Sequence, residues 1–226
     1  MTVRFVLASR SPARLAVLRA AGVDPIVRVS DVDEDAVAAA LPSDAPHAVV
    51  VTELAAAKAA VIADSLAHDP DLSTGTVVVV GCDSMLSIGG DLVGKPRDVA
   101  VARERWAAMA GASGDLLTGH CVLRLDDGRM TARSAAHCGT TVHFSSPTER
   151  DLEAYLRSGE PLAVAGAFTL DGLGGWFVDG IKGDPSSVIG IGLPLVRRLL
   201  AEVGVGIADL WESTEARRDG IDDTSV

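Results

Sequence analysis

The run TVVVVG at residues 76–81 constrains the fold more than any other part of the sequence. It is continuous and β-branched, without the alternation of apolar and polar positions that marks a strand exposed on one face. A strand of this kind is expected to be buried on both faces, with other elements packed above and below it. The run therefore predicts a central strand of a layered sheet.

Strands and helices alternate along the rest of the sequence. Residues 3–8 are typical of a buried strand, and Ser11-Pro12 then opens an apolar helix that stops at Gly22. The Ala- and Val-rich pattern over 47–68 predicts a long helix. The other predicted elements are a helix over 36–41, a hairpin around Gly89-Gly90, a helix capped by Asp98, two strands over 118–125 and 130–144 joined by Asp127-Gly128, a helix that begins at a capping box over 146–149 with Pro147 at its first position, a strand over 176–181 and a last amphipathic helix from Pro194.

The chain shows no internal repeat and no linker. Eight glycines fall between residues 165 and 192, and the apolar and aromatic residues among them indicate close backbone approach rather than a linker. We therefore predict an α/β fold in a single domain over 1–211. The segment 212–226 is polar, and we expect it to be a disordered tail.

Composition and charge limit the partners of the protein. A formal net charge of −11 argues against nucleic acid or an anionic membrane as a partner, because both require a basic surface. The chain has neither a signal peptide nor an apolar run of about 18 residues, and its three cysteines form no CxxC pair, so we expect a cytoplasmic protein. A small phosphorylated ligand remains compatible with this charge, because a few convergent cations can override the average locally.

The segment LASRSPAR places hydroxyl groups between the end of a strand and the start of a helix. Ser9 and Ser11 lie where unpaired N–H groups and the helix dipole favour an anion. Arg14, in the first turn, can reach back toward the same anion. The alternative is that Ser11 is a plain N-cap and Arg14 a solvated cation. The residues alone do not separate a phosphate site from a helix cap.

Two lysines are further candidates for contact with phosphate. Lys58 lies in the middle of an apolar stripe on the predicted long helix, so its ammonium needs a partner, either a substrate phosphate or a carboxylate across a cleft. It could instead extend from the edge of the stripe into solvent. Lys95 follows the hairpin in GKPR, on a stiff loop that suits a phosphate contact or an ordinary surface turn.

Two carboxylates are candidates for the catalytic and metal-binding groups. Asp83 follows the buried strand and projects from its carboxyl end, where open α/β sheets bind ligands. Such an aspartate is either a structural cap or a group that orients a metal ion or a water molecule. Glu34 lies in an acidic run and could pair with Asp83, because two carboxylates commonly hold Mg²⁺ or Mn²⁺ beside a triphosphate. A solvated acidic surface is the alternative for Glu34.

Taken in order, these segments resemble the Maf family of nucleotide pyrophosphatases from Val6 to Leu200. The segments that carry the resemblance are LASRSPARLAVL, DVDE, ELAAAKA, VVGCDSML, GKPRD, GEPLAVAGAFTLDGLGGWFVDGIKGD and SSVIGIGLPL. The sequence departs from the family pattern at Ala13, where the family often has a second arginine, and at Ala57, where an acidic residue is usual. The family's subgroups differ at such positions, so the preferred base stays open.

The resemblance implies a fold, a reaction and a set of site residues. The expected fold is an elongated, twisted mixed sheet flanked by helices, with two lobes around a cleft as in the inosine triphosphatase group, and often a homodimer. The expected reaction is metal-assisted attack of water at the α-phosphorus of a nucleoside triphosphate, which releases the monophosphate and pyrophosphate. The residues that match the family pattern are Asp83 as proton acceptor, Glu34 and Asp83 for Mg²⁺ or Mn²⁺, and Ser9, Arg14, Lys58 and Lys95 for the phosphates.

Two other functions stay open at this stage. One is a nucleotide-binding regulator of septum formation with little or no turnover, the property for which the family was first named. The other is a binding module for a different anion, such as a sugar phosphate. A binder has no need of a carboxylate that activates water, so Asp83 favours the enzyme.

Overall fold

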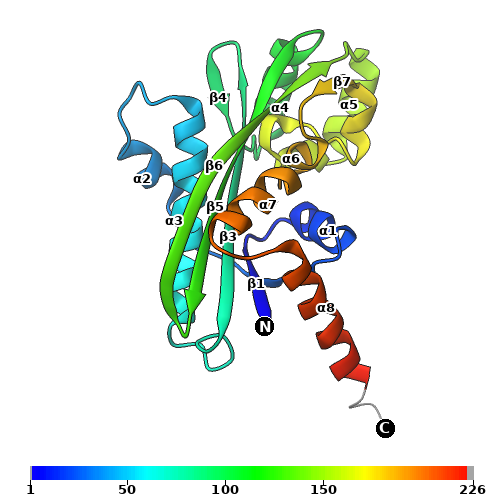
Figure 1. Cartoon of the computed structure of the whole chain (residues 1–226). Helices are drawn as coiled ribbons and strands as arrows, with labels where there is room; N and C mark the ends of the chain where they lie inside the picture. The colour runs from blue at the N-terminus through cyan, green and yellow to red at the C-terminus, as the bar shows by residue number, and fades with distance from the viewer. Residues whose placement is uncertain (1, 223–226) are drawn as a thin grey trace.

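The computed structural model describes the backbone of residues 2–222 and the side chains of residues 2–215. Within this part of the chain, seven strands form one mixed sheet in the order β2-β1-β3-β5-β6-β7, and β4 pairs with β3 beside this path (Figure 1). β1 is parallel to β2 and β3, and the other pairs are antiparallel. The strands are β1 Val3–Ala8, β2 Ile26–Arg28, β3 Thr76–Ile88, β4 Asp91–Val93, β5 Ser113–Asp126, β6 Arg129–Phe144 and β7 Val178–Lys182. The predicted α/β class is confirmed, with a mixed sheet at its centre.

Helices lie on both faces of this sheet (Figure 1). The α-helices are α1 Pro12–Ala20, α2 Glu34–Ala39, α3 His47–Leu66, α4 Val99–Met109, α5 Glu149–Arg157, α6 Pro185–Ile189, α7 Leu193–Glu202 and α8 Ile207–Asp222. Three short 3-10 helices, η1 Glu160–Ala163, η2 Ala165–Ala167 and η3 Leu173–Phe177, precede β7. None of the described helices has the length and apolar character needed to cross a bilayer.

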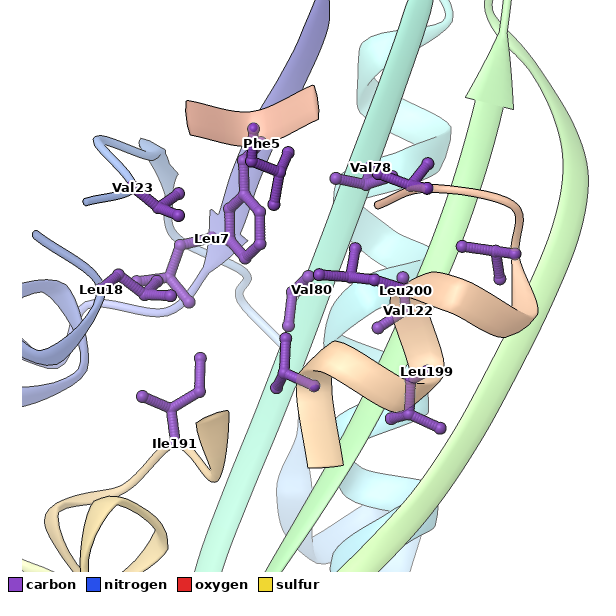
Figure 2. Close-up of a cluster of buried hydrophobic side chains, with 14 of the residues drawn as sticks. Phe5, Leu7, Leu18, Val23, Val78, Val80, Val122, Ile191, Leu199 and Leu200 are labelled. Carbon is purple, nitrogen blue, oxygen red and sulfur yellow. The ribbon is translucent and has the colours of Figure 1, made fainter. Parts of the chain in front are cut away.

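The central strand β3 is covered on both faces, as its sequence predicted. Val78 and Val80 are fully buried in a core cluster with residues of β1, α1, α7 and α8 (Figure 2). Val77 and Val79 point the other way, into a second cluster beneath α3. Each apolar position of the run 76–81 therefore buries its side chain against helices, which explains why the run does not alternate.

Two glycines allow α3 to lie against the sheet backbone. A Cβ atom on Gly119 of β5 would lie 2.1 Å from the carbonyl oxygen of Val51, and one on Gly81 of β3 would lie 2.2 Å from that of Ala55. No side chain fits between helix and sheet at these points. The middle of α3, which carries Lys58, is thereby held directly over the middle of β3.

A third cluster lies at the end of the sheet formed by the later residues of β3 and β6. Trp106 of α4 is fully buried there and makes edge-to-face contacts with Phe144, Tyr155 and Phe177. Its Nε1 atom donates to the carbonyl of Ala167 at 2.9 Å, so the indole is satisfied inside the core. The glycine-rich segment 165–192 folds around this cluster as η2, η3, β7 and α6.

The two predicted hairpins are confirmed. Strands β3 and β4 turn at Gly89-Gly90, with Ile88 opposite Asp91. Strands β5 and β6 turn at Asp127-Gly128, where both residues have positive φ, 49° and 72°, as the favoured two-residue turn requires.

Several predicted boundaries are wrong. The strand over 76–81 continues to Ile88 as β3, so Asp83 lies within it rather than after it, and the strand predicted over 118–125 begins at Ser113 as β5. The N-cap of α5 is Thr148 rather than Ser146, because it is the Thr148 hydroxyl that accepts from Asp151 N, and Pro147 therefore precedes the helix. The strand predicted over 176–181 begins only at Val178, because the two preceding residues belong to η3. The helix predicted at Pro194 is confirmed as α7, but it is not the last helix, because α8 follows it.

The structure also differs from the predicted tail. Helix α8 crosses the boundary at 211 and 212 and continues to Asp222, and residues 223–226 lie outside the described part. Leu210 is buried in the core, and the Ser213 hydroxyl accepts from Val3 N at 2.9 Å. The polar composition of the segment gave no sign of these contacts, because one buried face is enough to dock a helix.

Candidate functional site

Three charged side chains from separate segments meet at the middle of β3. Asp83 lies on β3, Lys58 on α3, and Glu34 is the first residue of α2, which packs beside α3 (Figure 1). Lys58 Nζ donates to Asp83 Oδ1 at 2.5 Å and lies 2.7 Å from Glu34 Oε1. The sequence left open whether Lys58 faces a phosphate or a carboxylate. In the structure one ammonium bridges two carboxylates.

Burial makes the two carboxylates different. The Asp83 side chain is 11% exposed and that of Glu34 is 48% exposed. Burial raises the pKa of Asp83 above its ordinary value, and the charges of Lys58 and Arg14 offset only part of this effect. Burial acts in the same direction on Glu34, but the hydrogen bond and charge of Lys58 and the charges of other cations outweigh it, so the pKa of Glu34 is lowered. Asp83 is the better proton acceptor, and Glu34 stays ionised.

The loop between β1 and α1 places Arg14 next to the same segment of β3. Ser11 caps α1, because its Oγ atom accepts from Arg14 N, so the N-cap interpretation of Ser11 is confirmed. Arg14 is half-buried, and its Nη1 atom donates to Ser9 Oγ at 3.0 Å and to the carbonyl of Cys82 at 2.9 Å. The alternative of a solvated arginine is therefore wrong. Arg14 and Ser9 lie together against the residue that precedes Asp83.

Lys95 lies on the loop after β4 and is exposed. Partial burial lowers its pKa, and repulsion from Arg14 acts in the same direction, while the charges of Glu34 and Asp83 oppose the shift. Lys95 therefore lies within electrostatic range of the arginine and of both carboxylates. Contacts join the other five candidate residues to one another or to Cys82 and Asp83 of β3, and Lys95 acts on them through its charge.

The carboxylates of Glu34 and Asp83 fit a divalent cation. One oxygen of each carboxylate lies within 2.7 Å of the same ammonium nitrogen, so the two carboxylates already share one positive charge. Among residues 2–215, no group of three or more histidine, cysteine or acidic side chains could enclose a metal ion. Mg²⁺ commonly binds through one or two carboxylates and takes its other ligands from water and substrate phosphates. The donor set therefore suits an ion that arrives with a polyphosphate.

Comparison with known proteins places the chain in a family. A family model described as Maf-like protein matches residues 4–203. The chain belongs to the Maf family. Three relatives are each named nucleoside triphosphate pyrophosphatase. The protein of Rhodococcus jostii strain RHA1 is 68% identical over 210 residues, which cover 93% of this chain and 97% of the relative. The protein of Nocardia farcinica strain IFM 10152 is 65% identical over 93% of this chain and 98% of the relative. The protein of Saccharopolyspora erythraea is 58% identical over 95% of this chain and 100% of the relative.

The structure adds residues to this Maf site that the sequence analysis missed. Arg14 Nε donates to the carbonyl of Gly190 at 2.7 Å, and Arg14 Nη2 donates to Ser84 Oγ at 3.2 Å. Ser84 Oγ also lies 3.1 Å from Thr118 Oγ1. Ser84 adjoins Asp83 in the Maf segment GCDSML, which was a signal that could have been used. The bond to Gly190 spans 176 positions, and no local pattern predicts it.

Proposed function

We propose that this chain hydrolyses nucleoside triphosphates between the α and β phosphates, with the cluster at Asp83 as the catalytic site. The chain is a nucleoside triphosphate pyrophosphatase, a hydrolase, as its membership of the Maf family and its identity of 58–68% to relatives of that name indicate. The observation on which the placement of the reaction rests is the buried Asp83, whose carboxylate accepts from Lys58 at 2.5 Å and whose preceding residue, Cys82, accepts from Arg14.

The proposed chemistry requires no covalent enzyme intermediate. Asp83 accepts a proton from a water molecule, the water oxygen attacks the α-phosphorus, and the bond from this phosphorus to the bridging oxygen breaks. Pyrophosphate leaves with the bonding electron pair. The raised pKa of Asp83 supports this role, because a general base acts best when its pKa approaches the working pH.

The positive groups stabilise the charge that moves onto the leaving pyrophosphate. We propose that Lys58 and Lys95 contact phosphate oxygens, and that Ser9 and Arg14 add a hydroxyl group and a positive charge next to Asp83. Glu34 and Asp83 would hold Mg²⁺ or Mn²⁺, which when bound neutralises phosphate charge. Lys58 would then exchange its carboxylate partners for phosphate.

Three further features complete the proposal. We propose that the sheet separates two lobes around a cleft, as in the inosine triphosphatase group, with the nucleotide between them. We expect the protein to be a homodimer. We also expect it to accept several nucleoside triphosphates, including modified ones.

Product analysis in water enriched in ¹⁸O tests the reaction. The protein is incubated with Mg²⁺ or Mn²⁺ and a panel of canonical and modified triphosphates, and the products are separated by anion exchange and weighed by mass spectrometry. We expect pyrophosphate without label and a nucleoside monophosphate with one ¹⁸O atom. Orthophosphate with a diphosphate, or label in pyrophosphate, would contradict attack at the α-phosphorus.

Two matched variants test the assignment of Asp83. Asp83→Asn removes the proton acceptor and keeps the shape, so we expect turnover to fall by about 10³-fold or more while nucleotide affinity stays within several-fold. Asp91→Asn changes an exposed carboxylate in the β3–β4 hairpin and should leave both unchanged. A fully active Asp83→Asn enzyme would refute the role of Asp83. Tight binding by the wild-type protein without turnover would instead support the regulator of septum formation.

A further inference from the structure

Most of the hydrogen-bonding capacity of Arg14 is directed at the protein itself. A guanidinium group carries five N–H bonds. Its Nε atom donates to Gly190 O at 2.7 Å, Nη1 donates to Ser9 Oγ at 3.0 Å and to Cys82 O at 2.9 Å, and Nη2 donates to Ser84 Oγ at 3.2 Å. Within the part of the chain that the structure describes, these four hydrogen bonds use four of the five N–H groups, and one N–H of Nη2 remains for another acceptor. A two-pronged grip on a phosphate needs two parallel N–H bonds, so it would require breaking one of these contacts.

The acceptors of Arg14 lie on both sides of Asp83 along β3. The pairing of β1 with β3 ends at Ala8 and Gly81. The next carbonyl of β3, that of Cys82, accepts from Arg14, so the arginine continues the hydrogen bonding that β1 supplies up to that point. The other contact on β3 is the hydroxyl of Ser84, directly after Asp83. Arg14 therefore fixes the strand immediately before and after the carboxylate.

The packing around Gly190 indicates that the contact with Arg14 is specific. Gly190 has φ of 131°, a region that other residues rarely adopt, and a Cβ atom there would lie 3.2 Å from Arg14 Nε. On the other side, Ser84 Oγ contacts Thr118 Oγ1, which donates to the carbonyl of Ser187 at 3.1 Å. The segment that follows β7 is thus tied to Arg14 directly and through Ser84.

We propose that Arg14 is a positioning residue, which orients Asp83 by holding the backbone on either side of it and the Gly190 turn beside it, rather than a residue that grips the triphosphate. The proposal rests on the proposed function of Asp83 as proton acceptor. Arg14 still contributes its positive charge to the site. Its hydrogen bonds, however, serve the geometry of the carboxylate and of the adjoining loops. Loss of the planar set of donors, with the positive charge kept, should therefore slow the chemical step and leave nucleotide binding unchanged.

Separate measurements of affinity and turnover test this proposal. Arg14→Lys keeps the charge but loses the fork of donors. The affinity for a triphosphate with a non-hydrolysable α,β-methylene bridge is measured by calorimetry with Mg²⁺, and kcat is measured with the matching natural nucleotide. We expect kcat to fall by about 10²-fold, as displacements near 1 Å do at reacting groups, and the Kd of the analogue to stay within about twofold at full binding stoichiometry. Lys95→Met is the comparison, because it should weaken analogue binding about tenfold or more.

The variant Ser84→Ala supplies a second test, which can be carried out even if Arg14→Lys does not fold. It removes one acceptor of Arg14 and should lower kcat several-fold with unchanged analogue affinity. In the double variant, kcat should be no lower than in Arg14→Lys alone, because both changes disrupt the same unit. The proposal is overturned if Arg14→Lys weakens analogue binding tenfold, if its kcat is unchanged, or if Ser84→Ala alters affinity instead of kcat. Failure of the proposed function is distinct, because the wild-type protein would then release no pyrophosphate in the same assay.

Discussion

The close approach of α3 to the sheet predicts that a single methyl group disrupts the site. Gly119 pairs with Asp83 across β3 and β5, and a Cβ atom on it would lie 2.1 Å from the Val51 carbonyl oxygen and 2.6 Å from Thr52 N. Both atoms belong to the helix backbone, so no side chain can rotate away. In Gly119→Ala, the helix itself must move.

The size of that movement follows from these distances. Contacts of real Cβ atoms are essentially never under 3.0 Å, so α3 must retreat by about 1 Å. The contact from Lys58 Nζ to Asp83 Oδ1, now 2.5 Å, would then approach 3.5 Å, at the limit of a hydrogen bond. Overpacking of this kind costs about 2 kcal/mol, which lowers the Tm of a domain of this size by about 4–8 °C. A displacement near 1 Å at a catalytic group lowers kcat/KM by about 10²-fold.

Two assays on purified Gly119→Ala measure these effects. Thermal unfolding followed by circular dichroism gives the Tm, and pyrophosphate release at 25 °C, well below that Tm, gives kcat/KM. Gly180→Ala on β7 is the control, because the nearest atom to its Cβ is 4.0 Å away. We expect it to keep kcat/KM within twofold and Tm within about 1 °C. A Gly119→Ala protein with wild-type kcat/KM and Tm would refute the argument that direct contact between helix and backbone holds Lys58 over Asp83.

Three further predictions follow from individual contacts. Lys58→Met removes the ammonium that Asp83 and Glu34 share and that competes with a metal ion for them. The affinity for Mn²⁺ without nucleotide, measured by electron paramagnetic resonance, should therefore increase about tenfold. An unchanged Kd for Mn²⁺ would contradict this competition. Burial lowers the pKa of His120 from 6.5 to about 3. Between these values the unfolded chain binds a proton that the folded chain does not, so the free energy of unfolding should decrease as the pH is lowered, by up to about 1.4 kcal/mol per pH unit. Urea unfolding at pH 7 and pH 5 should show this loss in the wild type and a smaller loss in His120→Gln, whereas equal losses would contradict it. Thr148→Ala removes the N-cap of α5 and should lower the free energy of unfolding in urea by about 1 kcal/mol. Ser146→Ala should lower it much less. The reverse order would favour Ser146, the cap predicted from the sequence.

Much of the sheet could be predicted because its signals are local. A run that is apolar at every position has to be buried on both faces, and Val77 to Val80 are fully buried. The turn at Asp127-Gly128 was predictable because its residues tolerate the positive φ that such turns need. The end of β3 was not predictable in this way. β3 continues to Ile88 through polar residues because β5 pairs with it as far as Ser87.

The candidate site was predictable as a set of residues but not as a geometry. A lysine in an apolar stripe must have a partner, so the sequence identified Lys58 as special without identifying Asp83 as its contact. The acceptors of Arg14 depend on how distant segments close around it, and the Gly190 carbonyl has no signature in sequence. The cap of α5 shows the same limit on a local scale, because Ser146 and Thr148 both suit an N-cap, and only the packed chain selects Thr148.

The contact between α8 and β1 joins two elements at opposite ends of the described part of the chain. Leu210 shares a core with Phe5, and the amide of Val3 has its acceptor in the Ser213 hydroxyl, 210 positions later. During synthesis the contacts of β1 with α1 and β3 can form early, but those with α8 form only after residue 207 has been added. A nascent chain leaves part of the β1 surface uncovered until α8 has been made, so a truncation that removes α8 should destabilise the first strand of the sheet and direct the fragment to chaperones or degradation.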